Sequence, residues 1–130
     1  MTSKVLVIED THGIRRLIRM TLEFDGFEVI EATDAQAGLD RIRQDPPHLV
    51  LLDVNMPGIN GLEACRMLRA DPRTAQLPVV MLTMANSPED MRRGMDAGAS
   101  LYLTKPFLPT QLLDIVHQLT TQPGAAVRIA

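Results

Sequence analysis

Short apolar runs recur along the chain and alternate with segments in which apolar residues repeat every three or four positions. Continuous apolar runs of this length are typical of strands that are buried on both faces of a parallel sheet. The runs at residues 5–8, 49–52 and 79–82 are the clearest, and weaker ones lie at residues 27–32 and 101–103. The pattern therefore predicts five strands, each followed by a helix.

The segments between the runs have the period of amphipathic helices. In the first segment the apolar positions fall on one face: Ile14, Leu17, Ile18 and Leu22. The charged positions of the same segment are predicted to face solvent: Arg15, Arg16, Arg19 and Glu23.

Helix-start signals support the same division. Thr33 and Gln36 have the spacing of a capping box, Ser87 precedes Pro88 as a cap precedes a first-turn proline, and Pro109 is suited to open the last helix. Five β–α units with right-handed crossovers favour a doubly wound, three-layer α/β sandwich with a parallel sheet.

Length and composition limit the remaining possibilities. The 130 residues are enough for one domain with a real core, 45% of them are hydrophobic, and the net charge of −3 offers no general attraction for nucleic acid or a membrane surface. Cys65 is the only cysteine, which fits a reducing cytoplasm. Pro123 and Gly124 end the periodic pattern, so we expect one domain at residues 1–121 and a short tail at 122–130.

Polar residues stand directly after the apolar runs. Glu9 and Asp10 follow the first, Asp53 the third, Thr83 the fourth and Lys105 the fifth. Any one of them alone is an ordinary turn former or cap, but the carboxyl ends of parallel strands meet at one edge, where ligands bind. Two carboxylates about 4 Å apart repel by about 4 kcal/mol at an effective dielectric constant of 20, so three of them call for a cation.

An all-oxygen site with few protein ligands is typical of Mg²⁺. A carboxylate, Mg²⁺, a hydroxyl and an ammonium together favour phosphoryl transfer to the carboxylate. Asp53 is the preferred nucleophile because it stands alone at the end of the central run, whereas Glu9 and Asp10 form a pair suited to holding the metal.

Four segments in order resemble the receiver domain of two-component response regulators, including chemotaxis regulators. They are Val5 to Asp10, Leu52 to Gly61, Leu82 to Ala85, and Gly98 to Phe107, within a similarity that runs from about residue 4 to 119. The resemblance implies flavodoxin-like strand order 2-1-3-4-5. It also implies a signalling phosphoprotein that catalyses only its own phosphorylation and dephosphorylation, and not an enzyme with other substrates.

The resemblance also implies roles in phosphorelay signal transduction. Asp53 would accept phosphate from a phosphohistidine on a sensor histidine kinase or a histidine phosphotransfer protein. Asp10 and Asp53 would bind Mg²⁺ directly, Asn55 would add its backbone carbonyl, and Glu9 would act through a water molecule. The side chain of Asn55 and that of Ala85 would tune hydrolysis of the aspartyl phosphate.

The same resemblance implies a switch. Thr83 and Lys105 would bind phosphoryl oxygens, and Tyr102 would turn inward as Thr83 moves; the Lys105–Pro106 peptide bond is expected to be cis. The face formed by the last two helices and the last strand would then bind a downstream protein, with no direct contact to nucleic acid or membrane. A homodimer through this face stays open, as do the kinase, the target and the lifetime of the phosphate.

Three alternatives compete with this interpretation. A haloacid-dehalogenase-type phosphohydrolase needs a second aspartate where this chain has Asn55, and a flavin carrier needs a first loop that accepts phosphate, which Glu9 and Asp10 would repel. The third is a degenerate receiver that acts as a phosphate-independent interaction module.

Outside the site, Cys65 and the pair Met91 and Met95 are interpreted as core or groove-filling residues. Isolated histidines are interpreted as ordinary surface residues: His12, His48 and His117.

Overall fold

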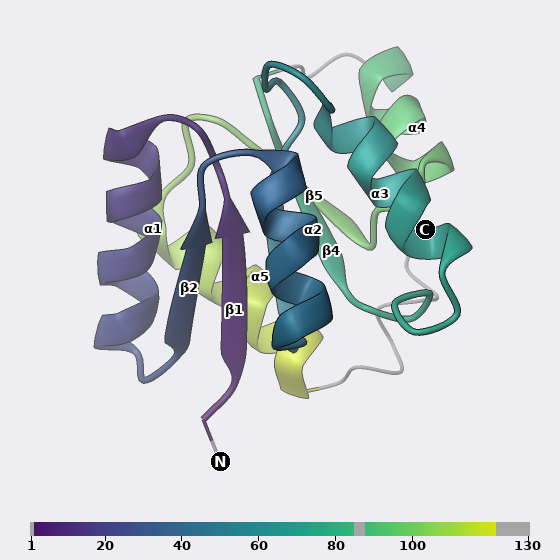
Figure 1. Ribbon diagram of the computed structural model, residues 1–130. Coiled ribbons are helices and arrows are strands. Elements are labelled where there is room, and N and C mark those ends of the chain that lie inside the picture. Colours follow the sequence, from purple (N-terminus) through teal and green to yellow (C-terminus); the bar gives the residue numbers. More distant parts are fainter. Residues whose placement is uncertain (1, 85–87, 122–130) are drawn as a thin grey trace.

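The structure is a computed structural model that describes residues 2–84 and 88–121. Strands and helices alternate along the chain (Figure 1). The strands are β1 (Lys4–Ile8), β2 (Glu28–Ala32), β3 (Leu49–Asp53), β4 (Val79–Thr83) and β5 (Leu101–Thr104). The helices are α1 (His12–Phe24), α2 (Ala35–Gln44), α3 (Gly61–Ala70), α4 (Pro88–Asp96) and α5 (Pro109–Thr121).

All strand pairs are parallel, and the strand order is β2-β1-β3-β4-β5. Alternate residues of each strand face opposite sides, so Leu6 and Ile8 pack toward α2 and α3, whereas Val5 and Val7 pack toward α1 and α5. The result is the three-layer doubly wound sandwich that the apolar runs predicted, with β3 at the centre of the sheet.

The start of α2 differs from the prediction by one residue. Asp34, not Thr33, is the N-cap, and its side chain accepts a hydrogen bond of 2.8 Å from the backbone amide of Ala37. An ionised carboxylate is a stronger acceptor than a hydroxyl, which explains why Asp34 takes this position. The helices α4 and α5 begin at Pro88 and Pro109, as predicted, while Ser87 lies outside the described residues.

The apolar stripe of α1 is narrower than the periodicity predicted. Ile18 and Leu22 are fully buried, but Leu17 is 44% exposed. Arg15, predicted to face solvent, has a side chain that is only 13% exposed, because it leans back along the helix toward the end of β2. Hydrophobicity along one helix cannot show such a contact, since the partner lies on a different element.

Two other predictions for apolar side chains have different outcomes. Cys65 is fully buried in the layer between the sheet and α3, as predicted. Met95 packs against the core, whereas Met91 is 43% exposed. Gly94 is the only buried residue of α4, so this helix covers the sheet with a narrow face.

Among the described residues, no helix combines the length and apolar character required to cross a lipid bilayer.

The edge of the sheet formed by the amino ends of the strands is fastened by Arg69 of α3. Its guanidinium donates hydrogen bonds to the carbonyls of Leu77 at 2.7 Å, Gly98 at 2.8 Å and Thr74 at 3.3 Å. Gly98 has a φ of +107° and leaves no room for a Cβ, which would lie 2.5 Å from Arg69 Cγ. Burial lowers the pKa of Arg69. The carbonyl contacts tie α3 to the turn between α4 and β5.

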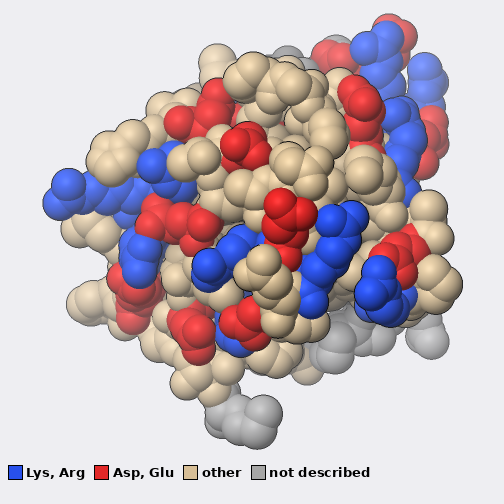
Figure 2. Space-filling model, viewed as in Figure 1, with Lys and Arg blue, Asp and Glu red and all other residues tan. Residues whose placement is uncertain are grey.

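The surface carries charges of both signs. On the face shown in Figure 2, acidic and basic side chains lie interspersed among uncharged ones. Several form ion pairs along or between elements, such as Lys4 with Asp45 at 2.6 Å and Arg93 with Glu89 at 3.2 Å. Exposed pairs of this kind contribute about 0–1 kcal/mol each, so the buried layers carry most of the stability.

Candidate functional site

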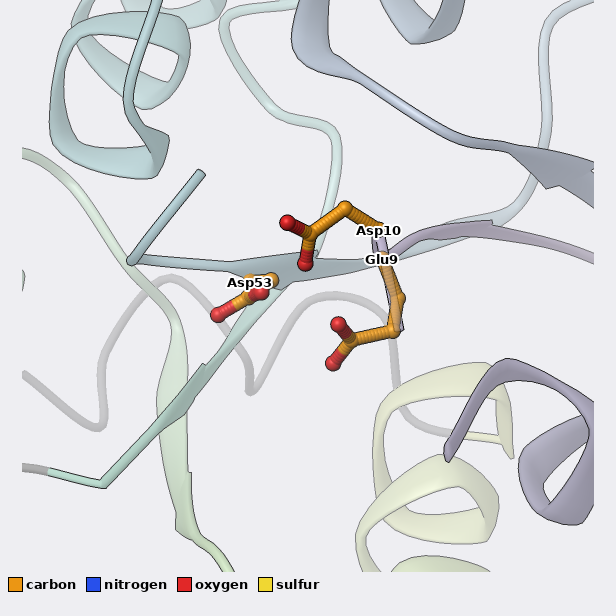
Figure 3. A group of neighbouring side chains, drawn as sticks. All are labelled: Glu9, Asp10 and Asp53. Carbon is orange, nitrogen blue, oxygen red and sulfur yellow. The ribbon is translucent and has the colours of Figure 1, made fainter. Parts of the chain in front are cut away.

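Three carboxyl groups meet at the carboxyl edge of the sheet. Glu9 and Asp10 follow β1 directly, and Asp53 is the last residue of the neighbouring strand β3. One carboxylate oxygen from each lies within 4.8 Å of the others (Figure 3). Glu9 and Asp53 are buried, whereas Asp10 is exposed. The convergence predicted from the ends of the apolar runs is therefore present in the structure.

Lys105 brings a positive charge to the same point. It follows β5, and its backbone amide donates to the carbonyl of Thr83 at 2.8 Å. The Nζ atom lies 2.7 Å from Glu9 Oε1 and 3.2 Å from Asp53 Oδ1. The Lys105–Pro106 peptide bond is cis, as predicted. One ammonium against three carboxylates leaves an excess of negative charge at this edge.

The environment separates the proton affinities of the two buried acids. Burial, and then contact with Glu9, raise the pKa of Asp53 from 3.8 to about 6, although Lys105 opposes the rise. Burial also acts to raise the pKa of Glu9, but the Lys105 ammonium and the amide of Thr11 outweigh it, so this pKa is lowered. Burial acts to lower the pKa of Lys105, yet the two acids raise it overall. Lys105 therefore stays charged beside two carboxyls that titrate as a pair.

The donor set fits a small divalent cation. Glu9 Oε1 is buried and lies 2.7 Å from the Lys105 ammonium. One ammonium cannot neutralise three carboxylates, and a divalent cation with its bound water would offset the remaining negative charge. All candidate ligands are oxygens, and the exposed side of Asp10 leaves room for water, which are the conditions that Mg²⁺ requires.

Asn55 and Thr83 flank the acidic cluster. The backbone amide of Asn55 donates to Asp53 Oδ1 at 3.1 Å, which orients that carboxylate. Thr83 ends β4, the next strand along the sheet, and is 1% exposed. Both line a cavity of about 410 Å³ that extends from the end of β3 toward α4. Ala85, the other residue expected to tune hydrolysis, lies outside the described residues.

Tyr102 lies on β5 at the far side of this cavity. Burial, and then the charge of Asp90, raise the pKa of its phenol. Its ring rests against Gly94 of α4, where a Cβ would lie only 2.6 Å from Tyr102 Cε2. The position of this ring is therefore coupled to the position of α4, while Tyr102 itself stands apart from the three carboxylates.

Sequence reasoning missed the contribution of Arg15. Its Nη1 donates to the backbone carbonyl of Glu9 at 2.9 Å, and its Nε donates to Glu31 Oε1 at 3.1 Å. One signal was available: Glu31 stands between apolar residues in the second half of the run at residues 27–32, and a charged residue among buried neighbours requires a partner.

The histidines lie in other places. His48 Nδ1 accepts a hydrogen bond from the backbone amide of Lys4 at 2.8 Å. His117 pairs with Asp25 and packs against the ring of Phe27, with ring centroids 5.3 Å apart. At the start of α1, His12 Nδ1 lies 3.3 Å from Arg15 Nη2. These contacts fasten the ends of helices and strands.

The fold and the site together describe a doubly wound α/β domain whose sheet edge gathers three carboxylates and one ammonium. The family model described as the response regulator receiver domain matches residues 5–117. The chain belongs to this family of signalling domains, as its four characteristic segments predicted.

Known relatives agree with this assignment. The phosphate regulon transcriptional regulatory protein PhoB of Klebsiella pneumoniae is 39% identical over 113 residues, which cover 87% of this chain and 49% of PhoB. The response regulator PleD of Caulobacter vibrioides is 38% identical over 120 residues, or 92% of this chain and 26% of PleD. The chain thus spans about half the length of PhoB, and less of PleD.

A solved structure shows the same fold. The chemotaxis protein CheY4 of Vibrio cholerae matches with a TM-score of 0.86 at 33% identity, over 91% of this chain and 98% of the CheY4 chain. The strand order 2-1-3-4-5 implied by the resemblance is therefore confirmed by both the topology and a related structure.

Proposed function

We propose that this chain is a phosphoacceptor in phosphorelay signal transduction, with Asp53 as the residue that is phosphorylated. The observation that carries the proposal is a buried carboxylate at the end of the central strand, next to two further carboxylates and 3.2 Å from the largely buried ammonium of Lys105. The functional unit is residues 1–121, with residues 122–130 as a tail. Because Cys65 is a buried free thiol, we extend the proposal to a cytoplasmic location.

In the proposed reaction an Asp53 carboxylate oxygen forms a bond to phosphorus as the bond between phosphorus and the donor histidine nitrogen breaks. Asp53 must be ionised to attack, and Lys105 compensates charge on the phosphoryl oxygens. When bound, Mg²⁺ would supply positive charge that compensates the carboxylates and the transferred group. Asp10, Asp53 and the Asn55 carbonyl would bind it directly, and Glu9 would act through water. Dephosphorylation by water returns Asp53 to a carboxylate. In this proposal the chain catalyses only its own phosphorylation and dephosphorylation.

The donor would be a sensor histidine kinase or a histidine phosphotransfer protein. An apolar pocket of about 220 Å³ lies next to the site, lined by Ile14, Leu17, Met84, Lys105, Pro106 and Phe107. Because Lys105 belongs both to this pocket and to the acidic cluster, a protein docked there would hold its phosphohistidine close to Asp53. Continuity with the reacting carboxylate is the reason to assign the pocket to the donor.

Phosphorylation adds a charge of about −1.5 to −2 and three acceptor oxygens, which Thr83 and Lys105 would bind. Movement of Thr83 would let Tyr102 turn inward, and the cavity that joins these two residues supports such coupling. The face formed by α4, β5 and α5 would then bind a downstream protein or a second copy of this chain. With a net charge of −3, we propose no direct contact with nucleic acid or membrane for this segment.

The test uses the full chain with Mg²⁺ and acetyl phosphate, followed by intact mass spectrometry. We expect a mass increase that hydroxylamine removes, that chelation of Mg²⁺ prevents, and that Asp53→Asn abolishes. The exposed acid Asp114 supplies the control, since Asp114→Asn should be phosphorylated as wild type. No increase with acetyl phosphate or a phosphorylated kinase would favour the interaction module, and steady hydrolysis of unrelated phosphoesters would favour the hydrolase.

A further inference from the structure

Arg15 connects three parts of the structure behind the acidic cluster. Its side chain is 13% exposed, and its guanidinium donates to the backbone carbonyl of Glu9 at 2.9 Å and to Glu31 Oε1 at 3.1 Å. Its backbone amide donates to the carbonyl of Thr11 at 3.0 Å. One residue of α1 thus joins the end of β2 to the loop that carries Glu9 and Asp10.

The contact to the Glu9 carbonyl matters because this carbonyl belongs to the peptide unit between Glu9 and Asp10. The amide of Glu9 donates to the carbonyl of Ala32 at 3.1 Å, so both backbone polar groups of Glu9 are held from the end of β2, one directly and one through Arg15 and Glu31. A peptide plane fixed in this way restricts the direction in which the side chain of Asp10 points.

We propose that Arg15 is a positioning residue for the divalent cation site. It holds the Glu9–Asp10 peptide so that both carboxylates face Asp53 before the cation arrives. The inference rests on the proposed function, because it assumes that the acidic cluster binds Mg²⁺. Residues that orient metal ligands without touching the metal typically change metal affinity 10-fold to 100-fold when removed.

A role in positioning and a role as a mere charge predict opposite results. Arg15 carries a positive charge near the cluster, so its removal should strengthen cation binding if charge alone counts. If Arg15 positions the Glu9–Asp10 peptide, its removal should weaken cation binding although a repulsive charge has been lost. Arg16 is a matched control, because it is the next residue of α1, carries the same charge and is exposed.

The experiment is an isothermal titration of the full chain with Mg²⁺ at neutral pH. We expect Arg15→Ala and Arg15→Met to bind Mg²⁺ on the order of 10-fold more weakly than wild type, and Arg16→Ala to bind equally or slightly more tightly. The methionine variant keeps the aliphatic stem, so it separates the lost hydrogen bonds from lost packing. Urea unfolding in EDTA checks that each variant is folded.

The outcomes distinguish the two proposals. Wild type that binds Mg²⁺, together with Arg15 variants that bind it as tightly as Arg16→Ala, would overturn the role of Arg15 and leave the proposed function in place. Wild-type protein that binds no Mg²⁺, or binds it equally after Asp53→Asn and Asp10→Asn, would overturn the cation site itself and the proposed function with it.

Discussion

Replacing Asp53 by asparagine should stabilise the protein when no metal is present. Burial and Glu9 raise the pKa of Asp53 from 3.8 to about 6, so the folded state holds its proton more tightly than the unfolded state. Ionised Asp53 therefore destabilises the fold at neutral pH. At 1.36 kcal/mol for each pKa unit, the cost approaches about 3 kcal/mol above pH 6. Asparagine has no charge to bury, and the raised pKa of Asp53 already includes the attraction of Lys105, so we expect a gain of about 3 kcal/mol.

The pH dependence gives this prediction its sign. The folded pKa lies above the unfolded pKa, so the penalty is absent below pH 3.8, grows between pH 3.8 and 6, and is complete above that range. The advantage of Asp53→Asn should therefore fall to about half its neutral value at pH 5. Urea unfolding in EDTA at pH 7.5 and pH 5 measures both values, and EDTA is needed because a bound cation would stabilise wild type alone.

Asp114→Asn serves as the control for this experiment, because Asp114 is exposed and such substitutions change stability by about 0.5 kcal/mol or less. Equal or lower stability of Asp53→Asn at pH 7.5 would refute the reasoning. So would a gain that does not shrink on acidification, since it would arise from something other than a buried charge.

Three further substitutions test contacts elsewhere in the fold. Gly94→Ala should displace the Tyr102 ring, because the new Cβ would lie 2.6 Å from it. Acrylamide quenching of tyrosine fluorescence should therefore change, and the signal is specific because the chain has one tyrosine and no tryptophan. Gly13→Ala is the control, since a Cβ there would meet nothing within 4 Å, and it should leave the quenching unchanged. Arg69→Met removes the donor to three backbone carbonyls and should cost about 3 kcal/mol in urea unfolding, whereas a loss below 1 kcal/mol would mean that water replaces it. Asn60→Ala removes the cap of α3, an acceptor at 2.9 Å, and should lower the free energy of unfolding by about 1 kcal/mol, which Asn60→Asp should not.

The features that the sequence predicts well depend on local hydrophobicity and on general rules of topology. The three uninterrupted apolar runs became β1, β3 and β4, because such a run has few alternatives to a buried strand, and the two weaker runs became β2 and β5. Glu9, Asp10 and Asp53 came together because parallel strands end at the same edge. Neither result needed knowledge of side-chain contacts.

The features that it does not predict depend on contacts between distant elements. Arg15 reaches Glu31 on β2, and Arg69 reaches Gly98, 29 residues away. Charged residues at helical spacing are normally solvated, so periodicity assigned Arg15 to the surface. The cap of α2 was misplaced for a smaller reason, since Thr33 and Asp34 are adjacent and both are good caps, and the stronger acceptor takes the position.

The contacts of Arg69 lie at the opposite end of the strands from Asp53. A strand of five residues spans roughly 17 Å, and about that distance separates the hydrogen bonds of Arg69 from the acidic cluster. Natural variation or laboratory redesign can therefore lengthen the loops around Arg69, or strengthen them against heat, without moving the carboxylates at the other end of the sheet.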